Sequence, residues 1–298
     1  MQVGLLLQGL QIIPSKSLNM FRVALSHDVD RIKKHYQYFT SPIKAISKGD
    51  LKSAMYHFLS FFGPEPYWNF PEIIRIEESF GVKSTFFILD ETLPFKIFDP
   101  KNWKLTLGRY KISNQKLRDA IKFLDQNGWE IGVHGSYLSY NNESLLSKEK
   151  ENIQEIIGHG IIGTRQHYLN WDKTTWVIQK SIGFKYDSTW GYTDSIGFKE
   201  DKILPFRPFG DYFIEIPLLV MDIPFMSTDN RWGKLHKIMD TLEEKNGIFV
   251  INWHHRVYNE KEFPGYNSAY HRIIQECIRR NARFLTLSEI YNELEKTI

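Results

Sequence analysis

Short apolar segments alternate with amphipathic segments along most of this 298-residue chain, and the alternation constrains its fold more than any other feature. Apolar residues from Leu117 to Leu124, for example, recur at the i, i+3, i+4 and i+7 positions of one helix face. The segments expected to form strands are 22–26, 82–89, 129–134, 161–164, 184–186, 212–216, 248–253 and 283–285. The segments expected to form helices are 113–127, 145–157, 172–181, 234–245, 266–279 and 288–296. Seven or eight strand–helix units predict an α/β protein with a parallel sheet closed into a (β/α) barrel.

The chain is expected to be one domain, residues 1–298, because a barrel of about 250 residues commonly folds as a unit. The aromatic content of 15% needs a core and excludes intrinsic disorder. Residues 34–68 break the alternation. They are long, aromatic and partly helical, so we expect an insertion after the first strand that lies over the mouth of the barrel.

Charge and cysteine content narrow the possible partners and cofactors. The net charge of 38 − 35 = +3 is too small to indicate a nucleic-acid binder. Cys277 is the single cysteine, so neither an intramolecular disulfide nor a cysteine-rich zinc site is available. Any metal must therefore be bound by histidine and carboxylate side chains.

Targeting signals are weak. The segment Met1–Pro14 is apolar but lacks a basic region and a small-residue cleavage site, so we expect no signal peptide. No run reaches the roughly 18 apolar residues of a membrane span. These features predict a cytoplasmic location.

Ionisable residues stand at the ends of several expected strands, where parallel barrels place their active sites. They are His27, Asp28, Asp30, His134, Arg165, His167, Asp187, His254 and His255. Asp28 and Asp30 are two residues apart, so on extended backbone they point to the same side, and a metal ion bound by Asp30 would offset their repulsion. A surface turn with solvated aspartates is the alternative. His27 lies one position before Asp28, so on extended backbone its side chain points to the opposite side. It is therefore expected to be structural.

This set resembles the polysaccharide deacetylase family (carbohydrate esterase family 4, NodB-like), over about residues 22–287. The match is closest to a branch with Asp-x-Asp and Arg-Gln-His-Tyr motifs, associated with cell-surface polysaccharide gene clusters. The resemblance implies a distorted (β/α)7-8 barrel of the NodB-homology type. It also implies metal-dependent removal of acetyl groups from sugars, usually with zinc.

The family's motifs imply roles for individual residues. Asp28 corresponds to the general base and Asp30 to a metal ligand. Arg165 corresponds to the arginine that orients the base, and His254 to the general acid. Asp187 is the nearest match to the aspartate that holds the catalytic histidine.

The second family motif is incomplete, which affects the metal site. Its first histidine corresponds to His134, but Leu138 stands where a second histidine ligand is usual. Zinc needs about three protein ligands and an open position. His167 at the next strand end could be the third ligand or could contact substrate, and His27 and His255 are weaker substitutes.

Three tryptophans lie beside these motifs and are candidate stacking surfaces for a sugar ring: Trp171, Trp190 and Trp253. A place in the hydrophobic core is the alternative for each.

The leading interpretation is a divalent-metal hydrolase, with zinc as the expected metal, that removes an acyl group from an N-acetylated sugar or oligosaccharide. A metal-independent amidohydrolase of the same fold is the alternative favoured by Leu138. A non-catalytic carbohydrate-binding relative is a third possibility, which the joint presence of Asp28, Arg165 and His254 disfavours. The sequence leaves the sugar and the oligomeric state open.

Overall fold

The computed structural model describes residues 11–12 and 21–296. Its strands are β1 (Gln11–Ile12), β2 (Arg22–Val29), β3 (Thr85–Leu89), β4 (Glu130–Gly135), β5 (Gly163–Gln166), β6 (Tyr186–Asp187), β7 (Phe206–Arg207), β8 (Ile214–Glu215), β9 (Val220–Met221), β10 (Ile248–Asn252) and β11 (Arg283–Phe284). Its helices are α1 (Gln37–Ser47), α2 (Leu51–Leu59), α3 (Phe70–Phe80), α4 (Pro100–Thr106), α5 (Gln115–Gln126), α6 (Glu143–Ile157), α7 (Thr175–Ser181), α8 (Asp222–Ser227), α9 (Arg231–Lys245), α10 (Tyr266–Arg279) and α11 (Leu287–Glu295). Short 3-10 segments are η1 (Ser60–Phe62), η2 (Ser139–Asn141), η3 (His167–Leu169), η4 (Lys199–Asp201) and η5 (His255–Tyr258).

The predicted strands and helices are present, with their ends shifted by a few residues, whereas β1, β7, β9, α3, α4 and α8 have no counterpart in the prediction. Side-chain caps explain several helix starts. Asn114 accepts a hydrogen bond from the backbone N–H of Leu117 and caps α5, which begins two residues later than the predicted helix 113–127. At the start of α11, Thr286 and Glu289 form a capping box.

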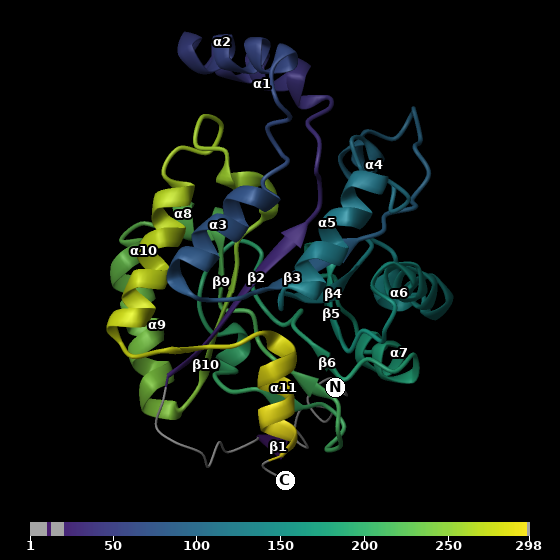
Figure 1. Cartoon of the computed structure of the whole chain (residues 1–298), viewed down its shortest axis with the longest axis vertical. Helices are drawn as coiled ribbons and strands as arrows, with labels where there is room; N and C mark the ends of the chain where they lie inside the picture. The colour runs from purple at the N-terminus through teal and green to yellow at the C-terminus, as the bar shows by residue number, and fades with distance from the viewer. Residues whose placement is uncertain (1–10, 13–20, 297–298) are drawn as a thin grey trace, which may run out of the picture.

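One curved sheet contains the described strands, in the order β1-β7-β8-β6-β5-β4-β3-β2-β10-β9, with β11 beside the start of β2 (Figure 1). The pairings are parallel, except that β7 runs antiparallel to both of its neighbours. The predicted α/β architecture is confirmed. Within residues 11–12 and 21–296, no pairing joins β9 to β1, so the sheet curls like a barrel but stays open on one side.

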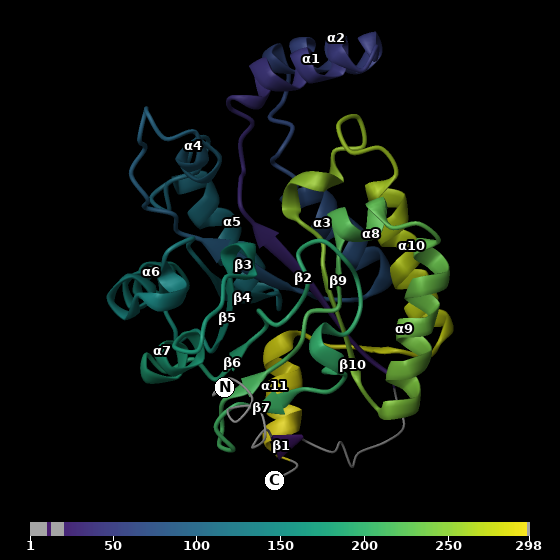
Figure 2. The ribbon, with the colours of Figure 1, turned by 180° about the vertical axis from the view of Figure 1, so that it is seen from behind.

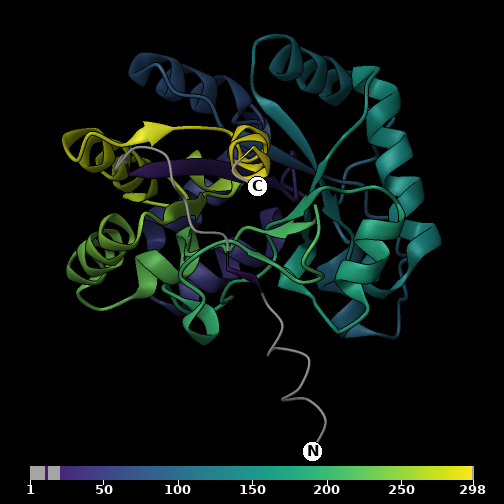
Figure 3. The same ribbon diagram turned by 90° about the horizontal axis from the view of Figure 1, so that it is seen from below.

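Residues of β2 alternate between two apolar regions. Val23 and Leu25 pack with the surrounding helices, whereas Ala24 faces the inside of the curve. Helix α11 fills part of this inside, where Leu287, Ile290, Tyr291 and Leu294 are buried, and Figure 3 shows it within the ring of outer helices. By the same alternation, Ser26 and Asp28 face inward, so the free end of the concave face is polar.

His27 points outward, as its parity predicted. Its Nε2 atom lies 2.8 Å from Glu77 Oε1 on α3, and its Nδ1 atom lies 2.7 Å from the carbonyl oxygen of Trp253. The side chain of Glu77 is fully buried and also accepts hydrogen bonds from Trp129 Nε1 and the Tyr270 hydroxyl. His27 is therefore part of a buried network that joins the sheet to its helical layer.

The segment 34–68 forms α1, α2 and η1. Helices α1 and α2 lie side by side and project beyond the carboxyl end of β2 (Figures 1 and 2). Gly63 to Asn69 lead back from this pair to α3.

The segment Met1–Pro14, on which the signal-peptide prediction rests, lies outside the described residues apart from Gln11 and Ile12. Within the described part of the chain, each helix is too short or too polar to cross a membrane.

Candidate active site

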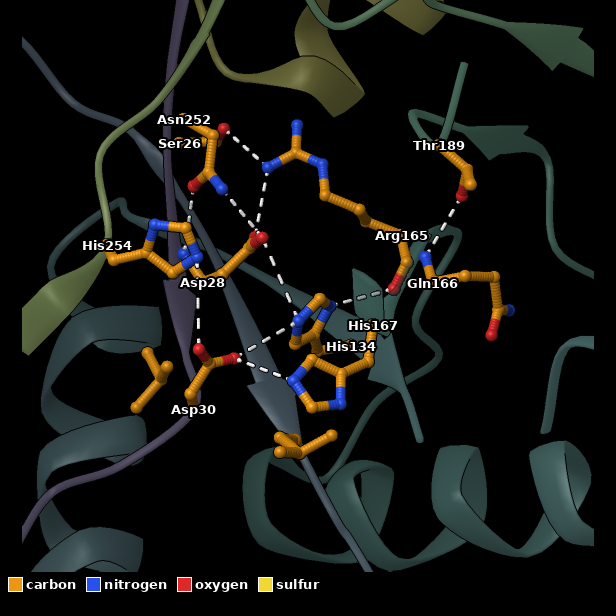
Figure 4. A network of polar contacts seen from close by, with 12 residues as sticks. Ser26, Asp28, Asp30, His134, Arg165, Gln166, His167, Thr189, Asn252 and His254 are labelled. Carbon is orange, nitrogen blue, oxygen red and sulfur yellow. Dashed lines mark hydrogen bonds and ion pairs between the residues drawn. The ribbon is translucent and has the colours of Figure 1, made fainter. Parts of the chain in front are cut away.

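Polar side chains converge at the carboxyl ends of β2, β4, β5 and β10 (Figure 4). They surround a small cavity of about 170 Å³. The described residues that line it are Asp28, Asp30, His134, His167, Tyr168, Leu169, Thr193, Met221, Ile223, Pro224, His254 and Arg256. The strand ends therefore bring together five of the predicted site residues in the cavity wall, and Arg165 lies behind it.

Asp28 is held on both carboxylate oxygens. Arg165 Nη1 donates to its Oδ1 atom at 3.0 Å, and Asn252 Nδ2 donates to its Oδ2 atom at 2.7 Å. Asn252 Oδ1 also accepts from the backbone N–H of Asp28 at 3.1 Å, so the two residues are joined by a pair of hydrogen bonds. Burial raises the pKa of Asp28, but the charges of His134 and Arg165 outweigh this effect and hold the pKa below its usual value. Asp28 is thus an oriented carboxylate that is ionised at neutral pH.

Arg165 is fully buried and its guanidinium is fixed by several acceptors. Its Nε atom donates to the carbonyl oxygen of Ser188 at 2.9 Å, and Nη1 donates to the hydroxyl of Ser26 at 2.8 Å as well as to Asp28. The ring of Phe87 packs against its flat face at 4.4 Å. This arrangement leaves one orientation for the group that positions Asp28, as the family resemblance implied.

A group of three side chains beside Asp28 has the composition of a metal site. The Oδ1 atom of Asp30 lies 3.4 Å from His134 Nε2 and 3.5 Å from His167 Nε2. Zinc at 2.0–2.2 Å from tetrahedral ligands requires donor separations of about 3.4 Å. Among the described residues, this is the one group of three or more such side chains with ligand atoms close enough to share an ion.

Two further observations fit a cation at this position. Asp30 Oδ1 is buried, and no hydrogen-bond partner for it is found in the described chain. His134 Nδ1 donates to the carbonyl oxygen of Arg165 at 2.9 Å, which leaves the lone pair on Nε2 free to face Asp30. The three side chains therefore fit a divalent cation, and His167 takes the place that Leu138 cannot fill. Leu138 itself is 43% exposed and is not part of the cavity wall.

Two arginines approach the same atoms. Arg256 Nη1 lies 2.7 Å from Asp30 Oδ2, and Arg109 Nη2 lies 3.3 Å from His167 Nε2. Arg109 Nη1 also donates to the backbone carbonyl of Asp30 at 3.0 Å. Burial raises the pKa of Asp30, but its neighbours His167, His134, His254 and Arg256 favour the charged form and hold the pKa well below its usual value. Burial lowers the pKa of His167 well below its usual value, so this imidazole is neutral. Arg109 and Arg256 therefore supply the positive charge nearest these atoms.

His254 follows β10 and is oriented by Asp222, the first residue of α8. Its Nδ1 atom lies 2.9 Å from both carboxylate oxygens of Asp222, and its backbone N–H donates to the same carboxylate at 2.6 Å. Its Nε2 atom lies 3.8 Å from Asp30 Oδ2, on the cavity side. Burial lowers the pKa of His254, but the charge and hydrogen bond of Asp222 outweigh this and raise it. Asp222 thus favours the imidazolium form of His254, whose Nε2 atom faces the cavity.

The expectation that Asp187 holds this histidine was wrong. Asp187 accepts a hydrogen bond from Thr189 at 2.6 Å and shares a buried site with Glu215, and burial raises the pKa of both carboxyl groups. The strand order explains the difference. β9, which precedes Asp222, lies next to β10, whereas four strands separate β6 from β10.

Of the three candidate stacking residues, Trp190 and Trp253 lie in the core, and Trp171 is half-buried against it. Trp253 is fully buried against Tyr270 and Phe225, so it cannot stack on a sugar. Trp190 is 4% exposed, and Trp171 packs against it with ring centroids 5.1 Å apart. None of the three lines the cavity, and the core alternative holds for Trp190 and Trp253.

Tyr168, the tyrosine of the Arg-Gln-His-Tyr motif, does line the cavity. Tyr168 is 51% exposed, and it and Leu169 both have positive φ angles, 59° and 52°. Such backbone is costly for residues other than glycine.

Four other residues of the site were not identified from the sequence: Asn252, Asp222, Arg109 and Arg256. For Asp222 a signal existed, because the apolar run before it resembles the other strands that end in polar residues.

Comparisons with known proteins define the fold class. No family model and no curated protein matches the sequence. A protein assigned as a polysaccharide deacetylase from Mycobacterium smegmatis has a similar structure, with a TM-score of 0.59 and 19% identity over 96% of this chain and 95% of that chain. The fold of the polysaccharide deacetylases, implied by the sequence motifs, is therefore confirmed.

Two further structures share the fold. One is assigned as a polysaccharide deacetylase from Pseudomonas aeruginosa PAO1, with a TM-score of 0.59 and 14% identity over 93% of this chain and 92% of that chain. The other is the allantoinase Puue, with a TM-score of 0.61 and 15% identity over 96% of this chain and 94% of that chain. At these identities the likeness concerns the fold alone.

Proposed function

We propose that this protein is a hydrolase that removes an N-acyl group, in the simplest case acetyl, from a sugar unit with the help of a bound zinc ion. The observation that carries the proposal is the position of Asp28 and His254 beside the Asp30, His134 and His167 group. An ionised carboxylate and a protonated imidazole at one cavity are what amide hydrolysis requires, because water must lose a proton while the amine gains one.

The side chains divide this reaction between them. A divalent cation held by Asp30, His134 and His167 would polarise the acyl carbonyl and lower the pKa of water. The carboxylate of Asp28 accepts the proton of the attacking water, while Arg165 and Asn252 keep the carboxylate oriented. His254 Nε2 donates a proton to the amine nitrogen as the C–N bond breaks. The products are a carboxylate, such as acetate, and an amino sugar.

The substrate class and setting extend this proposal. An N-acetylated sugar or oligosaccharide fits the resemblance and the deacetylases of the same fold, and a role in cell-surface polysaccharide metabolism follows from the motif branch. Tyr168, which is half exposed at the cavity, supplies a ring for contact with a sugar.

The test is acetate release from a panel of N-acetylated amino sugars, before and after chelation and zinc addition. We expect chelation to abolish activity, zinc to restore it, and His167→Ala to lose both activity and bound zinc. The matched control is His159→Ala, an exposed histidine paired with Asp125, which should keep both. Zinc that fails to bind, or activity insensitive to chelation, would overturn the metal-dependent mechanism.

A metal-independent amidohydrolase acting on another C–N bond is the second candidate. It is favoured by Arg109 and Arg256, whose guanidinium groups lie against His167 Nε2 and Asp30 Oδ2. The allantoinase of similar fold gives it a precedent in reaction class. Hydrolysis of a non-sugar amide by the chelated protein, unchanged in His167→Ala, would support it over the deacetylase.

A further inference from the structure

Exposed apolar side chains are concentrated in α1, α2 and η1. In the described chain, nine of the 21 exposed large hydrophobic residues lie between residues 39 and 62. These nine are Phe39, Ile43, Ile46, Leu51, Met55, Phe58, Leu59, Phe61 and Phe62, with exposed fractions from 55% to 75%. Soluble monomers rarely expose so many together, so this hairpin surface calls for a contact.

The exposed residues follow the helical repeat, so they form a face. Phe39, Ile43 and Ile46 recur at i, i+4 and i+7 on α1. On α2, Leu51, Met55 and Phe58 follow the same spacing. Three residues connect the two antiparallel helices, which pack side by side.

Both stripes project to one side of the pair. Ile46 follows the buried Ala45, and Met55 follows the buried Ala54. In two antiparallel right-handed helices, the positions that follow the packed ones turn toward the same side. The hairpin therefore has one continuous apolar face.

Basic residues accompany this face. Lys44, Lys48 and Lys52 are exposed, and Asp50 is the one acidic residue between positions 37 and 62, which gives a net charge of 3 − 1 = +2. The carboxylate of Asp50 is engaged at the start of α2, where it accepts from the backbone and hydroxyl of Ser53. An apolar face flanked by lysines is typical of helices that lie in the interface of an anionic membrane.

The hairpin is held firmly relative to the active site. The backbone N–H of Lys34 donates to Glu65 Oε1 at 2.7 Å, which joins the two segments that lead to and from the hairpin. The buried ammonium group of Lys34 pairs with Glu262 at 2.9 Å, and Tyr67 donates to the same carboxylate at 2.7 Å. These contacts fix the apolar face at the end of the molecule where the strands open into the cavity (Figures 1 and 2).

A second apolar segment lies at the same end. Phe95, Ile97 and Phe98 precede α4 with exposed fractions of 50%, 62% and 97%, and Lys96 between them is also exposed. In Figures 1 and 2 this loop projects toward the side on which the hairpin stands. The α1–α2 hairpin and the loop before α4 thus both expose apolar and lysine side chains, and both lie at the same end of the fold.

We propose that the α1–α2 hairpin binds the interface of a lipid bilayer that contains anionic headgroups. Phe39, Phe58 and their neighbours enter the acyl boundary, and Lys44, Lys48 and Lys52 contact the headgroups. The net charge of the hairpin favours an anionic bilayer over a second copy of the chain as its partner. Two hairpins of net charge +2 repel each other, whereas an anionic surface attracts each of them. The cavity end of the protein then faces the membrane.

Vesicle sedimentation tests the proposal with the full-length protein. We expect it to bind vesicles of phosphatidylcholine and phosphatidylglycerol, and to bind pure phosphatidylcholine more weakly. The triple variant Phe39→Ser, Ile43→Ser, Phe58→Ser should bind at least about tenfold more weakly. The variant Lys44→Gln, Lys48→Gln, Lys52→Gln should lose the preference for anionic vesicles and its dependence on salt.

The matched control replaces exposed apolar residues elsewhere: Phe123→Ser, Val177→Ser, Ile278→Ser should bind as the wild type does. Circular dichroism checks that each variant is folded. Absence of vesicle binding by the wild type, or equal binding by the hairpin and control variants, would overturn the proposal. A concentration-dependent dimer that the hairpin variant abolishes, without vesicle binding, would assign the face to a second copy instead. None of these results depends on the proposed enzymatic activity.

Discussion

His254 Nδ1 lies 2.9 Å from both carboxylate oxygens of Asp222, a residue that follows a different strand and lies 32 positions earlier in the chain. This contact sets the protonation state of the group that faces the cavity. Because the Asp222 carboxylate raises the pKa of His254 above its usual value, the imidazolium persists to higher pH than in a free histidine.

The first prediction concerns the pH dependence of activity. Hydrolysis needs ionised Asp28 and protonated His254, so kcat should fall as the pH rises through the raised pKa of His254. Asp222→Asn removes the stabilising charge, so this fall should move to lower pH, and activity at neutral pH should drop at least about tenfold. The pH–rate profile of acetate release measures both effects. Asp229→Asn, at an exposed aspartate between α8 and α9, should leave the profile unchanged.

The second prediction separates the base from the metal ligands. Asp28→Asn keeps the shape of the side chain but cannot accept a proton, so kcat should fall by about 100-fold or more. Zinc content should stay the same, because Asp30, His134 and His167 are intact. Metal analysis beside the rate assay provides the measurement, with the exposed Asp194→Asn as the control. Loss of zinc from Asp28→Asn would show that Asp28 is itself a ligand.

The third prediction concerns stability. Glu77 is fully buried and accepts hydrogen bonds from Ser84, Trp129 and Tyr270 while its carboxylate contacts His27. Glu77→Leu would leave these donors without an acceptor, so the free energy of unfolding should fall by about 3 kcal/mol or more. Urea denaturation measures it. Glu78→Leu, an exposed neighbour on the same helix, should change stability by less than about 0.5 kcal/mol. Equal effects of the two substitutions would contradict the structural role of the network.

The fourth prediction distinguishes core aromatics from cavity aromatics. Tyr168→Ala should raise the KM for the sugar with little change in stability, since the ring is half exposed at the cavity. Trp253→Phe should lower the free energy of unfolding by about 1–3 kcal/mol and leave the KM unchanged, because the indole is fully buried. Steady-state kinetics gives the KM of each variant, and denaturation gives its free energy of unfolding. A raised KM in Trp253→Phe would restore its predicted contact with substrate.

Local pattern was sufficient for much of the fold. Helix α10 has the predicted bounds, because its apolar residues Tyr270, Ile273, Ile274 and Cys277 share one face. The parity of β2 was also sufficient to place Asp28 inward and His27 outward. Strands of two residues, such as β7 and β9, carry too little periodicity to be found this way.

Two residues of the site, Asp222 and Asn252, could not be identified from the sequence because their neighbours depend on how the strands are ordered and paired. Asp187 and Asp222 both follow or end short strands, and only the adjacency of β9 and β10 shows which carboxylate reaches His254. Asn252 was hidden for a related reason. It ends an apolar strand, and its role depends on the register that places it beside Ser26 on β2.

The pairing of β2 also determines when the active site can form. This strand carries Asp28 and leads into Asp30, yet it pairs with β10 and β11 from the opposite end of the chain, and the hydroxyl of Ser26 bonds to the carbonyl of Ile251, 225 residues away. Contacts of such long sequence separation form slowly, because the intervening chain must first be ordered. A nascent chain that has not yet reached β10 contains both aspartates, His134, Arg165 and His167, but β2 then has an unpaired edge. The hydrogen bond that Asn252 donates to Asp28 therefore cannot form until residues 248–252 have been synthesised.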